Sequence, residues 1–273
     1  MKKIRKNFLV ISQYDRDLSW IPEYTDNYLI YDRGTNHILP PGIDPKKVVL
    51  SPNVGYNTYD YMRYIVEHYD DLPDVIIFAK AWTFPRHTTK EHFERVMNNE
   101  TYTPITDWHL HKDKWPYGFI SPDGLVCELN TDAFLGPDRP TKYFHSYNDF
   151  LRFCFKDPVI PRYRIFAPGG DCIIPKANIL RMPKVVYQNL MLFTAHHQHC
   201  GETHIIERTM IPLFCGNFEL SDEILKPVDE RTFKAVPKKI ESHSLPSRVA
   251  RRIRFEIERA LATVWNHMHP LNQ

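Results

Sequence analysis

Short apolar runs separated by turn-forming residues dominate the first eighty residues. They cover residues 8–11, 28–31, 48–50 and 75–78 and are rich in β-branched side chains. Runs of about four such residues are typical of strands buried on both faces of a sheet. We therefore expect four strands in this part of the chain.

A helical pattern lies between the third and fourth runs. From Asn57 to Tyr69, apolar and aromatic side chains recur at spacings of one, three and four residues, which indicates an amphipathic helix. A helix between two buried strands is typical of a right-handed βαβ unit. The sequence thus predicts an α/β fold with a mostly parallel sheet, in which ligands bind at the carboxyl ends of strands.

The middle of the chain, residues 82–165, is rich in Pro, Trp, Tyr and His and shows little periodicity. Long functional loops are expected there, with short helices near 90–97 and 146–155. After Pro168-Gly-Gly170 the pattern predicts a strand over 172–174 and helices near 184–196 and 203–214. We expect one domain over 1–217, with parts 1–81 and 82–217, followed by an extended segment and a helix over 218–273.

The last predicted helix, Ser247 to His267, is amphipathic. Its apolar stripe consists of Val249, Ile253, Ile257, Leu261 and Val264. Arg residues occupy other positions, but Glu256 and Glu258 among them favour a solvated face over a membrane or nucleic-acid contact. We expect the stripe to pack on the domain over 1–217 or on a second subunit, so a homodimer through this helix is an open alternative.

Composition excludes several classes of protein. The 273 residues include 35 Lys and Arg against 33 Asp and Glu, so net charge implies no nucleic-acid partner. Five cysteines without a C-x-x-C pair signal neither a disulfide framework nor a zinc ribbon. No apolar run approaches the roughly 20 residues of a membrane span, and no signal peptide is evident. A soluble, cytoplasmic protein is expected.

Polar turns follow three of the predicted strands. They are Ser12-Gln13-Tyr14-Asp15, Tyr31-Asp32-Arg33-Gly34 and Pro52-Asn53-Val54-Gly55. Each one alone is consistent with turn chemistry, in which Asn53 caps the next helix and Gly55 permits close backbone approach. Their common position at strand ends favours a ligand site.

Six longer strings stand out along the chain: Ile11–Trp20, Ile30–Gly34, Pro52–Gly55, Tyr61–Phe78, Gly169–Lys176 and Ile206–Met210. Together they resemble a small glycosyltransferase-like family of fungi, bacteria and large algal viruses. The resemblance extends roughly from residue 8 to residue 216, and the Tyr61–Phe78 string is its most specific part. In that family Arg-Glu usually follows Asn-Val-Gly, whereas Tyr56-Asn57 stands here.

This resemblance implies the glycosyltransferase A-type fold, with a nucleotide-sugar-binding half and an acceptor-binding half. The donor-binding candidates are Ser12, Gln13, Tyr14, Asp32, Asn53, Gly55, Lys80 and Arg208. Typical members hold a divalent metal with Asp-x-Asp after the fourth strand, but Ala79-Lys80-Ala81 contains no carboxylate. We expect Lys80 to stabilise the leaving diphosphate in place of the metal, so Mn²⁺ and Mg²⁺ are not favoured. A surface lysine is the alternative.

Sugar transfer with inversion needs a carboxylate that takes the proton of the acceptor hydroxyl. Glu207, next to Arg208 as a phosphate partner, is the first candidate for this base, and Asp171 is the second. A helix-surface ion pair of Glu207 and a turn role of Asp171 are the alternatives.

Aromatic and polar residues of the middle segment supply acceptor-binding candidates. These are Trp82, Asp107 and His109, together with His204, one turn before Glu207. Aromatic faces pack on the C–H face of a pyranose while polar side chains bind its hydroxyls. Core packing is the alternative role of the aromatic residues.

Histidines cluster at His196-His197-Gln198-His199-Cys200 and His204. Their spacing does not match a zinc finger or an H-E-x-x-H site, so no metal is expected. A zinc hydrolase that uses residues 196–204 is nevertheless an alternative function.

The function expected from these features is transfer of a sugar from a nucleoside diphosphate to a glycan. A UDP-sugar is favoured as donor, with UDP-xylose as the specific candidate, and a fucose-containing glycan as acceptor in a viral setting, in the host cytoplasm. The further alternative is a non-catalytic carbohydrate-binding or scaffold protein of the same fold.

Overall fold

The computed structural model describes residues 2–107, 110, 118–120, 126–130, 132 and 134–236. Towards the C-terminus it describes residues 249, 253–254, 256–257, 260–261, 263–264 and 267–268. His109 is not among these residues, so the prediction of its role lies outside the described part of the chain.

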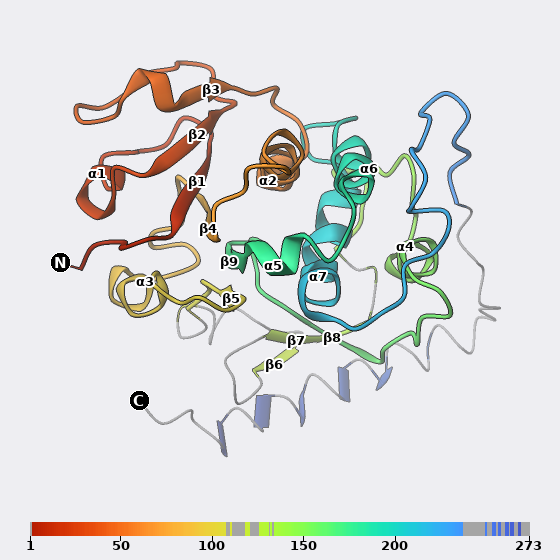
Figure 1. Cartoon of the computed structure of the whole chain (residues 1–273). Helices are drawn as coiled ribbons and strands as arrows, with labels where there is room; N and C mark the ends of the chain where they lie inside the picture. Colours follow the sequence, from red (N-terminus) through yellow and green to blue (C-terminus); the bar gives the residue numbers. More distant parts are fainter. Residues whose placement is uncertain are drawn as a thin grey trace.

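A six-stranded sheet with the strand order β3-β2-β1-β4-β9-β5 forms the centre of the fold (Figure 1). Its strands are β1 (Phe8–Gln13), β2 (Tyr28–Asp32), β3 (Val48–Leu50), β4 (Val75–Lys80), β5 (Thr103–Pro104) and β9 (Cys172–Pro175). The first four are parallel, and β9 runs antiparallel to both β4 and β5. The predicted α/β fold with a mostly parallel sheet is therefore confirmed.

The chain order creates a switch point in this sheet. From β1 the chain adds β2 and β3 on one side and then returns to add β4 on the other side of β1. Ser12, near the end of β1, pairs with Lys80 at the end of β4. Ligands of open α/β sheets bind in the crevice at such a point.

Helices cover both faces of the sheet (Figure 1). They are α1 (Ile21–Tyr24), α2 (Tyr56–Glu67), α3 (Lys90–Val96), α4 (Tyr147–Cys154), α5 (Lys176–Ile179), α6 (Lys184–Thr194) and α7 (Gly201–Cys215), with a 3₁₀ turn, η1 (Pro45–Lys47). Val10 and Phe78 pack in the cluster with α2, α6 and α7, while Leu9 and Ile77 pack in the cluster with α1 and α3. Because alternate side chains enter two apolar cores, the strands read as continuous apolar runs.

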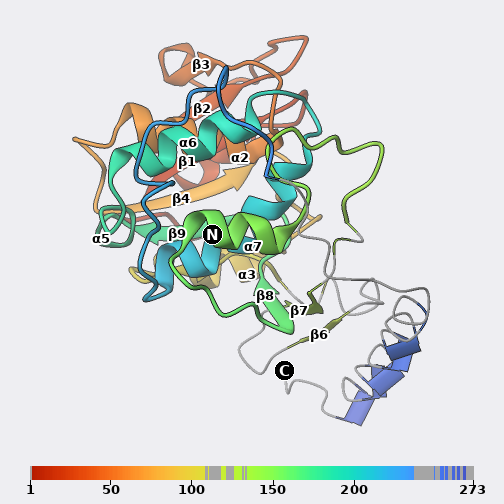
Figure 2. The ribbon, with the colours of Figure 1, turned by 90° about the vertical axis from the view of Figure 1, so that its right-hand side faces the viewer.

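A second, three-stranded antiparallel sheet lies beyond α7 (Figure 2). It contains β6 (Gly118–Ile120), β7 (Val126–Leu129) and β8 (Tyr163–Phe166). The sequence pattern predicts only loops and short helices over 82–165, so these strands are an addition to the prediction. The predicted helices near 90–97 and 146–155 are confirmed as α3 and α4.

The C-terminal residues that the structure describes are helical. The stripe residues Val249, Ile253, Ile257, Leu261 and Val264 are each more than half exposed. The prediction that this stripe packs on the domain over 1–217 is therefore wrong for these residues, while packing on a second subunit stays a prediction. No helix within the described ranges is long and apolar enough to cross a bilayer.

Candidate functional site

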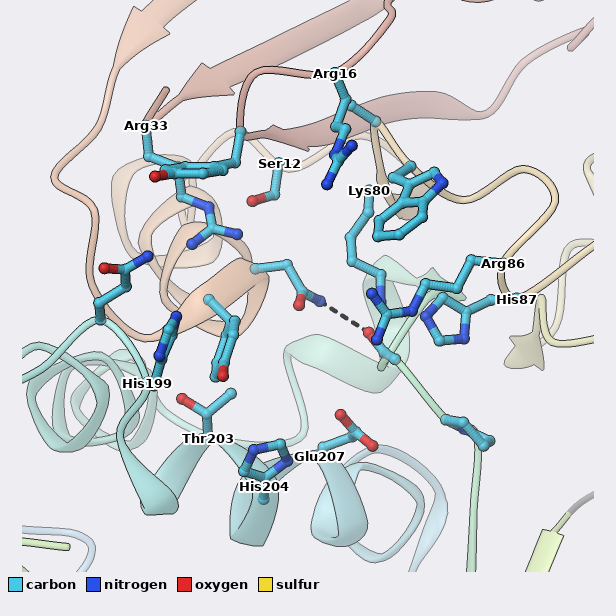
Figure 3. Close-up of a pocket in the computed structure, with 18 of the residues that line it drawn as sticks. Ser12, Arg16, Arg33, Lys80, Arg86, His87, His199, Thr203, His204 and Glu207 are labelled. Atoms are coloured by element: carbon cyan, nitrogen blue, oxygen red, sulfur yellow. Dashed lines mark hydrogen bonds between the residues drawn. The ribbon is translucent and has the colours of Figure 1, made fainter. Parts of the chain in front are cut away.

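A pocket of about 450 Å³ opens at the carboxyl ends of β1, β2 and β4 (Figure 3). Ser12 and Tyr14 enter it from the end of β1, Arg33 from the end of β2 and Lys80 from the end of β4. The first turns of α2 and α7 contribute Tyr56, Asn57, Thr203 and His204 to the lining. The pocket thus lies at the switch point between β1 and β4, and its volume falls in the range of small-molecule sites.

The pocket is strongly cationic. Its described Lys and Arg side chains are Arg16, Arg33, Lys80, Arg86, Arg139 and Arg208, and its one described carboxylate is that of Glu207. The N-termini of α2 and α7 add partial positive charge. Such a lining favours a ligand that carries more than one negative charge.

Lys80 lies at the centre of this lining, against the backbone of Gly169 (Figure 3). A methyl group at Gly169 would lie 2.5 Å from Lys80 Nζ, so the absence of a side chain there gives the ammonium its place. Burial lowers the pKa of Lys80, while the carboxylates of Asp171 and Glu207 raise it. These two carboxylates therefore favour the charged lysine.

Asp171 is completely buried and does not line the pocket. Its carboxylate accepts hydrogen bonds from Tyr61 Oη at 2.9 Å and Thr83 Oγ1 at 2.8 Å. Burial raises the pKa of Asp171, and Lys80 and these hydroxyls lower it. The second candidate for the base therefore lies behind Lys80, where its charge acts on the ammonium.

Glu207 projects from α7 into the pocket, with its side chain 15% exposed (Figure 3). Burial raises the pKa of Glu207, and Arg208, Lys80 and a hydrogen bond from the Gly169 backbone N–H oppose this shift. Its ion pair with Arg208 is weak, because Arg208 Nη1 lies 3.8 Å from Glu207 Oε1. The carboxylate is therefore accessible, fixed by the backbone and more basic than an ordinary glutamate.

Arg208 also lines the pocket, but its charge is already paired. Its Nε donates to Glu128 Oε1 at 2.6 Å, and its guanidinium lies 3.9 Å from the Phe134 ring centroid and 4.4 Å from that of Phe166. Arg208 thus joins α7 to β7 and β8, and less of its charge is free for a ligand than the sequence alone suggests.

Asp60, which no sequence motif marks, connects the strand ends beneath the pocket. It is completely buried and accepts hydrogen bonds from Ser12 Oγ and Ser51 Oγ, both at 2.5 Å. Arg33 Nε lies 3.7 Å from Asp60 Oδ2, and Arg33 Nη1 donates to Asn53 Oδ1 at 3.3 Å. One carboxylate therefore fixes side chains at the ends of three neighbouring strands.

The start of α2 differs from the cap that the sequence suggests. Gly55 is the N-cap, in the left-handed region at φ 58°, and Asn53 makes no capping hydrogen bond. Asn57 Nδ2 donates to Gly169 O at 2.9 Å. Asn57 thus ties the start of α2 to the segment before β9, beside Lys80.

An aromatic wall stands across from the strand ends. The Tyr56 ring stacks on His199, with centroids 4.9 Å apart and planes 13° apart, and meets His204 edge-on at 5.7 Å. A side chain at Gly55 would lie 2.6 Å from Thr194 O, so only glycine lets α2 approach the α6–α7 corner this closely. Flat rings in this wall suit a planar ligand group such as a nucleobase.

His204 has a ring nitrogen directed into this region, and Nε2 is buried without a hydrogen-bond partner among the described residues. Burial and nearby Arg208 lower the pKa of His204 to about 3. The imidazole is therefore neutral and can exchange one hydrogen bond with a bound ligand.

Four of the predicted donor-binding residues do not line the pocket: Gln13, Asp32, Asn53 and Gly55. Two of them, Gln13 and Asp32, shape turns. Gln13 Nε2 donates to Arg16 O at 3.0 Å, and Arg16 N donates to Gln13 Oε1 at 3.1 Å. Asp32 accepts from Gly34 N at 2.9 Å and lies 2.7 Å from His37 Nδ1. Both residues hold the loops from which lining side chains project.

The predicted acceptor-binding residues are separated by the fold. Trp82 lines the pocket and is 40% exposed, with the guanidinium groups of Arg16 and Arg86 over its ring. Asp107 is buried outside the lining and accepts from Thr89 Oγ1 at 2.9 Å.

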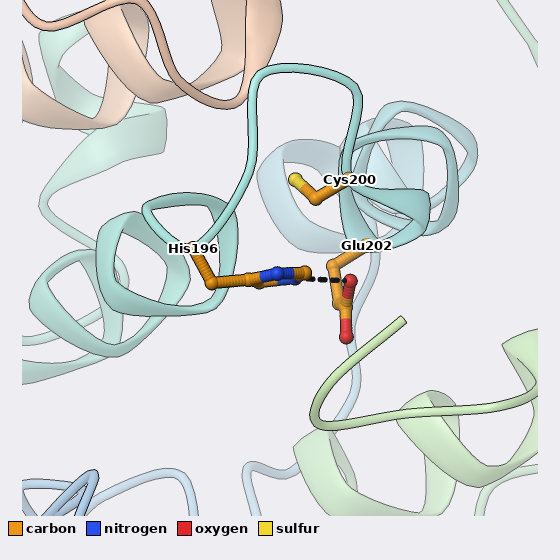
Figure 4. Close-up of side chains that lie close together, drawn as sticks. All are labelled: His196, Cys200 and Glu202. Carbon is orange, nitrogen blue, oxygen red and sulfur yellow. Dashed lines mark hydrogen bonds and ion pairs between the residues drawn. The ribbon is translucent and has the colours of Figure 1, made fainter. Parts of the chain in front are cut away.

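The histidine segment forms a compact cluster of His196, Cys200 and Glu202, whose potential ligand atoms lie within 4.8 Å of one another (Figure 4). Glu202 Oε2 lies 2.9 Å from His196 Nε2, and Glu202 Oε1 accepts from the backbone of Lys142 and Tyr143, each at 2.7 Å. Burial raises the pKa of Cys200 to about 11. These contacts join the α6–α7 corner to the chain before α4. The expectation that no metal binds here stays a prediction, with a zinc hydrolase as its alternative.

Comparison with known proteins gives one match. A family model described as a protein of unknown function (DUF3431) matches residues 9–114. No curated protein and no solved structure matches the chain. The matched stretch contains the strand ends with Ser12, Arg33 and Lys80, but not Glu207.

Proposed function

We propose that the protein is a glycosyltransferase of the A-type fold that moves a sugar from a nucleoside diphosphate to a carbohydrate acceptor, with inversion and without a metal ion. The observation that carries this proposal is the position of Lys80 beside Glu207 in a cation-lined pocket at the switch point of the sheet. A UDP-sugar is the favoured donor, and UDP-xylose is the first to test.

The chemical step divides between these two side chains. The acceptor hydroxyl oxygen attacks the anomeric carbon, and Glu207 takes the proton of that hydroxyl. The bond from the anomeric carbon to the diphosphate oxygen breaks, and its electron pair leaves with the nucleoside diphosphate. Lys80 and Arg33 stabilise the developing negative charge, which a preformed cationic site does without reorganisation. Because burial raises the pKa of Glu207, its carboxylate accepts the proton more readily.

The donor set does not fit a divalent metal. Mg²⁺ and Mn²⁺ prefer several carboxylate and carbonyl oxygens, whereas the described lining offers one carboxylate among six Lys and Arg side chains. We therefore assign no step to a metal ion and give its electrostatic role to Lys80.

The first test is donor binding. The full chain is screened by thermal shift against UDP- and GDP-sugars, with EDTA and with Mn²⁺. We expect a rise in melting temperature with a nucleotide sugar in EDTA, because the proposed site holds the diphosphate with side chains alone. Failure of every nucleotide sugar to bind, or activity that EDTA abolishes and Mn²⁺ restores, would contradict the proposal.

The second test is catalysis. Glu207→Gln keeps the shape of the side chain but cannot take a proton, so kcat for hydrolysis or transfer should fall by about 10²–10⁴ while the fold persists. Glu223→Gln, at an exposed position outside the pocket, is the matched control. A Glu207→Gln variant with the turnover of the control excludes Glu207 as base, and donor binding without any turnover in the parent protein favours the carbohydrate-binding alternative.

A further inference from the structure

A second cationic cluster stands at the exposed side of the pocket. It consists of Arg16, Trp82 and Arg86, and all three residues are exposed. The guanidinium carbon of Arg16 lies 4.2 Å from the Trp82 ring centroid, and that of Arg86 lies 4.9 Å from it. These are cation–π contacts, which keep two like charges on one ring.

Both arginines project from ordered loops. The loop of Arg16 is fixed by the paired hydrogen bonds with the Gln13 side chain, at 3.0 and 3.1 Å. The turn that contains Arg86 is closed by His87 N, which donates to Thr83 O at 3.0 Å. The two charges are therefore held close together before any ligand arrives, which lowers the entropy cost of binding.

The buried carboxylates near the pocket lie beside other cations and not beside Arg16 or Arg86. Lys80 and Arg33 each have a buried carboxylate behind them, Asp171 and Asp60, and they face the donor diphosphate in the proposed function. Within the described part of the chain, no carboxylate oxygen lies within 4.0 Å of the side-chain nitrogens of Arg16 or Arg86.

A neutral sugar does not explain this arrangement. Its C–H face would stack on the Trp82 ring, but the guanidinium groups already lie over that ring. Guanidinium groups form strong, directional hydrogen bonds with carboxylate, sulfate and phosphate oxygens.

We propose that Arg16 and Arg86, supported by Trp82, bind a second anionic group that is carried by a sugar substrate. The group is a carboxylate, sulfate or phosphate, and it is separate from the donor diphosphate; this inference rests on the proposed glycosyl transfer. The acceptor is the expected source, and a uronic acid in the donor is the other source.

The experiment compares matched pairs of neutral and anionic sugars in calorimetric titrations of the full chain, with and without UDP. The acceptor pairs are methyl glucoside with methyl glucuronide, and methyl galactoside with its 6-sulfate; the donor pair is UDP-glucose with UDP-glucuronic acid. In at least one pair the anionic member should bind about tenfold more tightly or better, as expected for one charge-assisted hydrogen bond. The pair that shows the preference identifies the source.

Substitutions of Arg16 and Arg86 test whether these two residues cause the preference for the anionic sugar. Arg86→Gln and Arg16→Gln should each remove most of the preference, and Arg86→Glu should reverse it. Arg231→Gln, an exposed arginine outside the pocket, should keep it. Equal or undetectable binding of both members in every pair, or a preference that survives in Arg86→Glu, overturns the inference.

The two proposals fail separately. If UDP binds and no pair shows an anionic preference, the cluster inference is wrong and the glycosyltransferase proposal stands. If anionic sugars are preferred but no nucleotide binds, the cluster inference holds in its binding part and the glycosyltransferase proposal fails.

Discussion

Asp60 gives a quantitative prediction about the pH dependence of stability. Its carboxyl group is completely buried under the strand ends, with Ser12, Ser51 and Arg33 around it. Burial raises its pKa from 3.8 to about 6, because the loss of hydration outweighs the two hydroxyl donors and the guanidinium.

The direction of this pH dependence follows from the linkage between protonation and folding. The folded protein holds the Asp60 proton up to a higher pH than the unfolded chain does, so protonation of this group favours folding. Its stabilising contribution is complete below about pH 3.8 and is lost as the pH rises through about 6. The shift of about two pH units, at 1.36 kcal/mol each, amounts to roughly 3 kcal/mol.

Urea unfolding, followed by tryptophan fluorescence at about pH 4, 5, 6 and 7, measures this contribution. The free energy of unfolding of the parent protein minus that of Asp60→Asn should fall by roughly 2 kcal/mol from pH 4 to pH 7, because part of the contribution is already lost at pH 4. Asp222→Asn, at an exposed position, is the matched control, and its difference should change by less than about 0.5 kcal/mol. A difference for Asp60→Asn that is flat over this range, or that rises with pH, would refute the reasoning.

Three further predictions follow from the pocket. Lys80→Met should lower kcat by about 10²–10³ in a donor-hydrolysis assay, because it removes the cation beside the leaving group; unchanged kcat would count against that role. Gly55→Ala places a methyl group 2.6 Å from Thr194 O at φ 58°, so it should lower the free energy of unfolding by at least about 1–2 kcal/mol in urea titrations. The acid limb of the kcat/KM–pH profile, which reports the free enzyme, should lie above pH 4.5, because the base must be ionised and burial raises the pKa of Glu207; a limb at or below 4.5 would exclude it.

The main sheet could be predicted because its strands enter two apolar cores, whereas β8 could not. In β8 the buried positions are Arg164 and Phe166, while Ile165 is 42% exposed. Arg164 is buried because its guanidinium lies 4.2 Å from the Tyr147 ring centroid and 5.1 Å from that of Phe134. Because a charged residue lies on the inner face and an apolar one on the outer face, the hydropathy pattern does not predict this strand.

At the sheet edge, the candidate site was predictable where a residue type and a strand end coincide, whereas Glu207 on α7 was expected from the family resemblance. Lys80 ends an apolar strand, and Arg33 follows another one in a turn already noted for Asp32. The direction of a polar side chain after a strand is set by tertiary contacts, so sequence cannot tell that Asp32 turns towards Gly34 while Arg33 enters the pocket. Asp60 and Arg139 carry no local signal, since one lies within a helix and the other in an irregular segment.

Two stretches that are distant in the sequence line the pocket together. The family match ends between them, at residue 114. In this chain the matched stretch supplies the lysine at the sheet edge, and a later stretch supplies the facing glutamate. A resemblance to residues 9–114 alone therefore concerns one wall of the pocket, and inferring a reaction also requires the residues after 114.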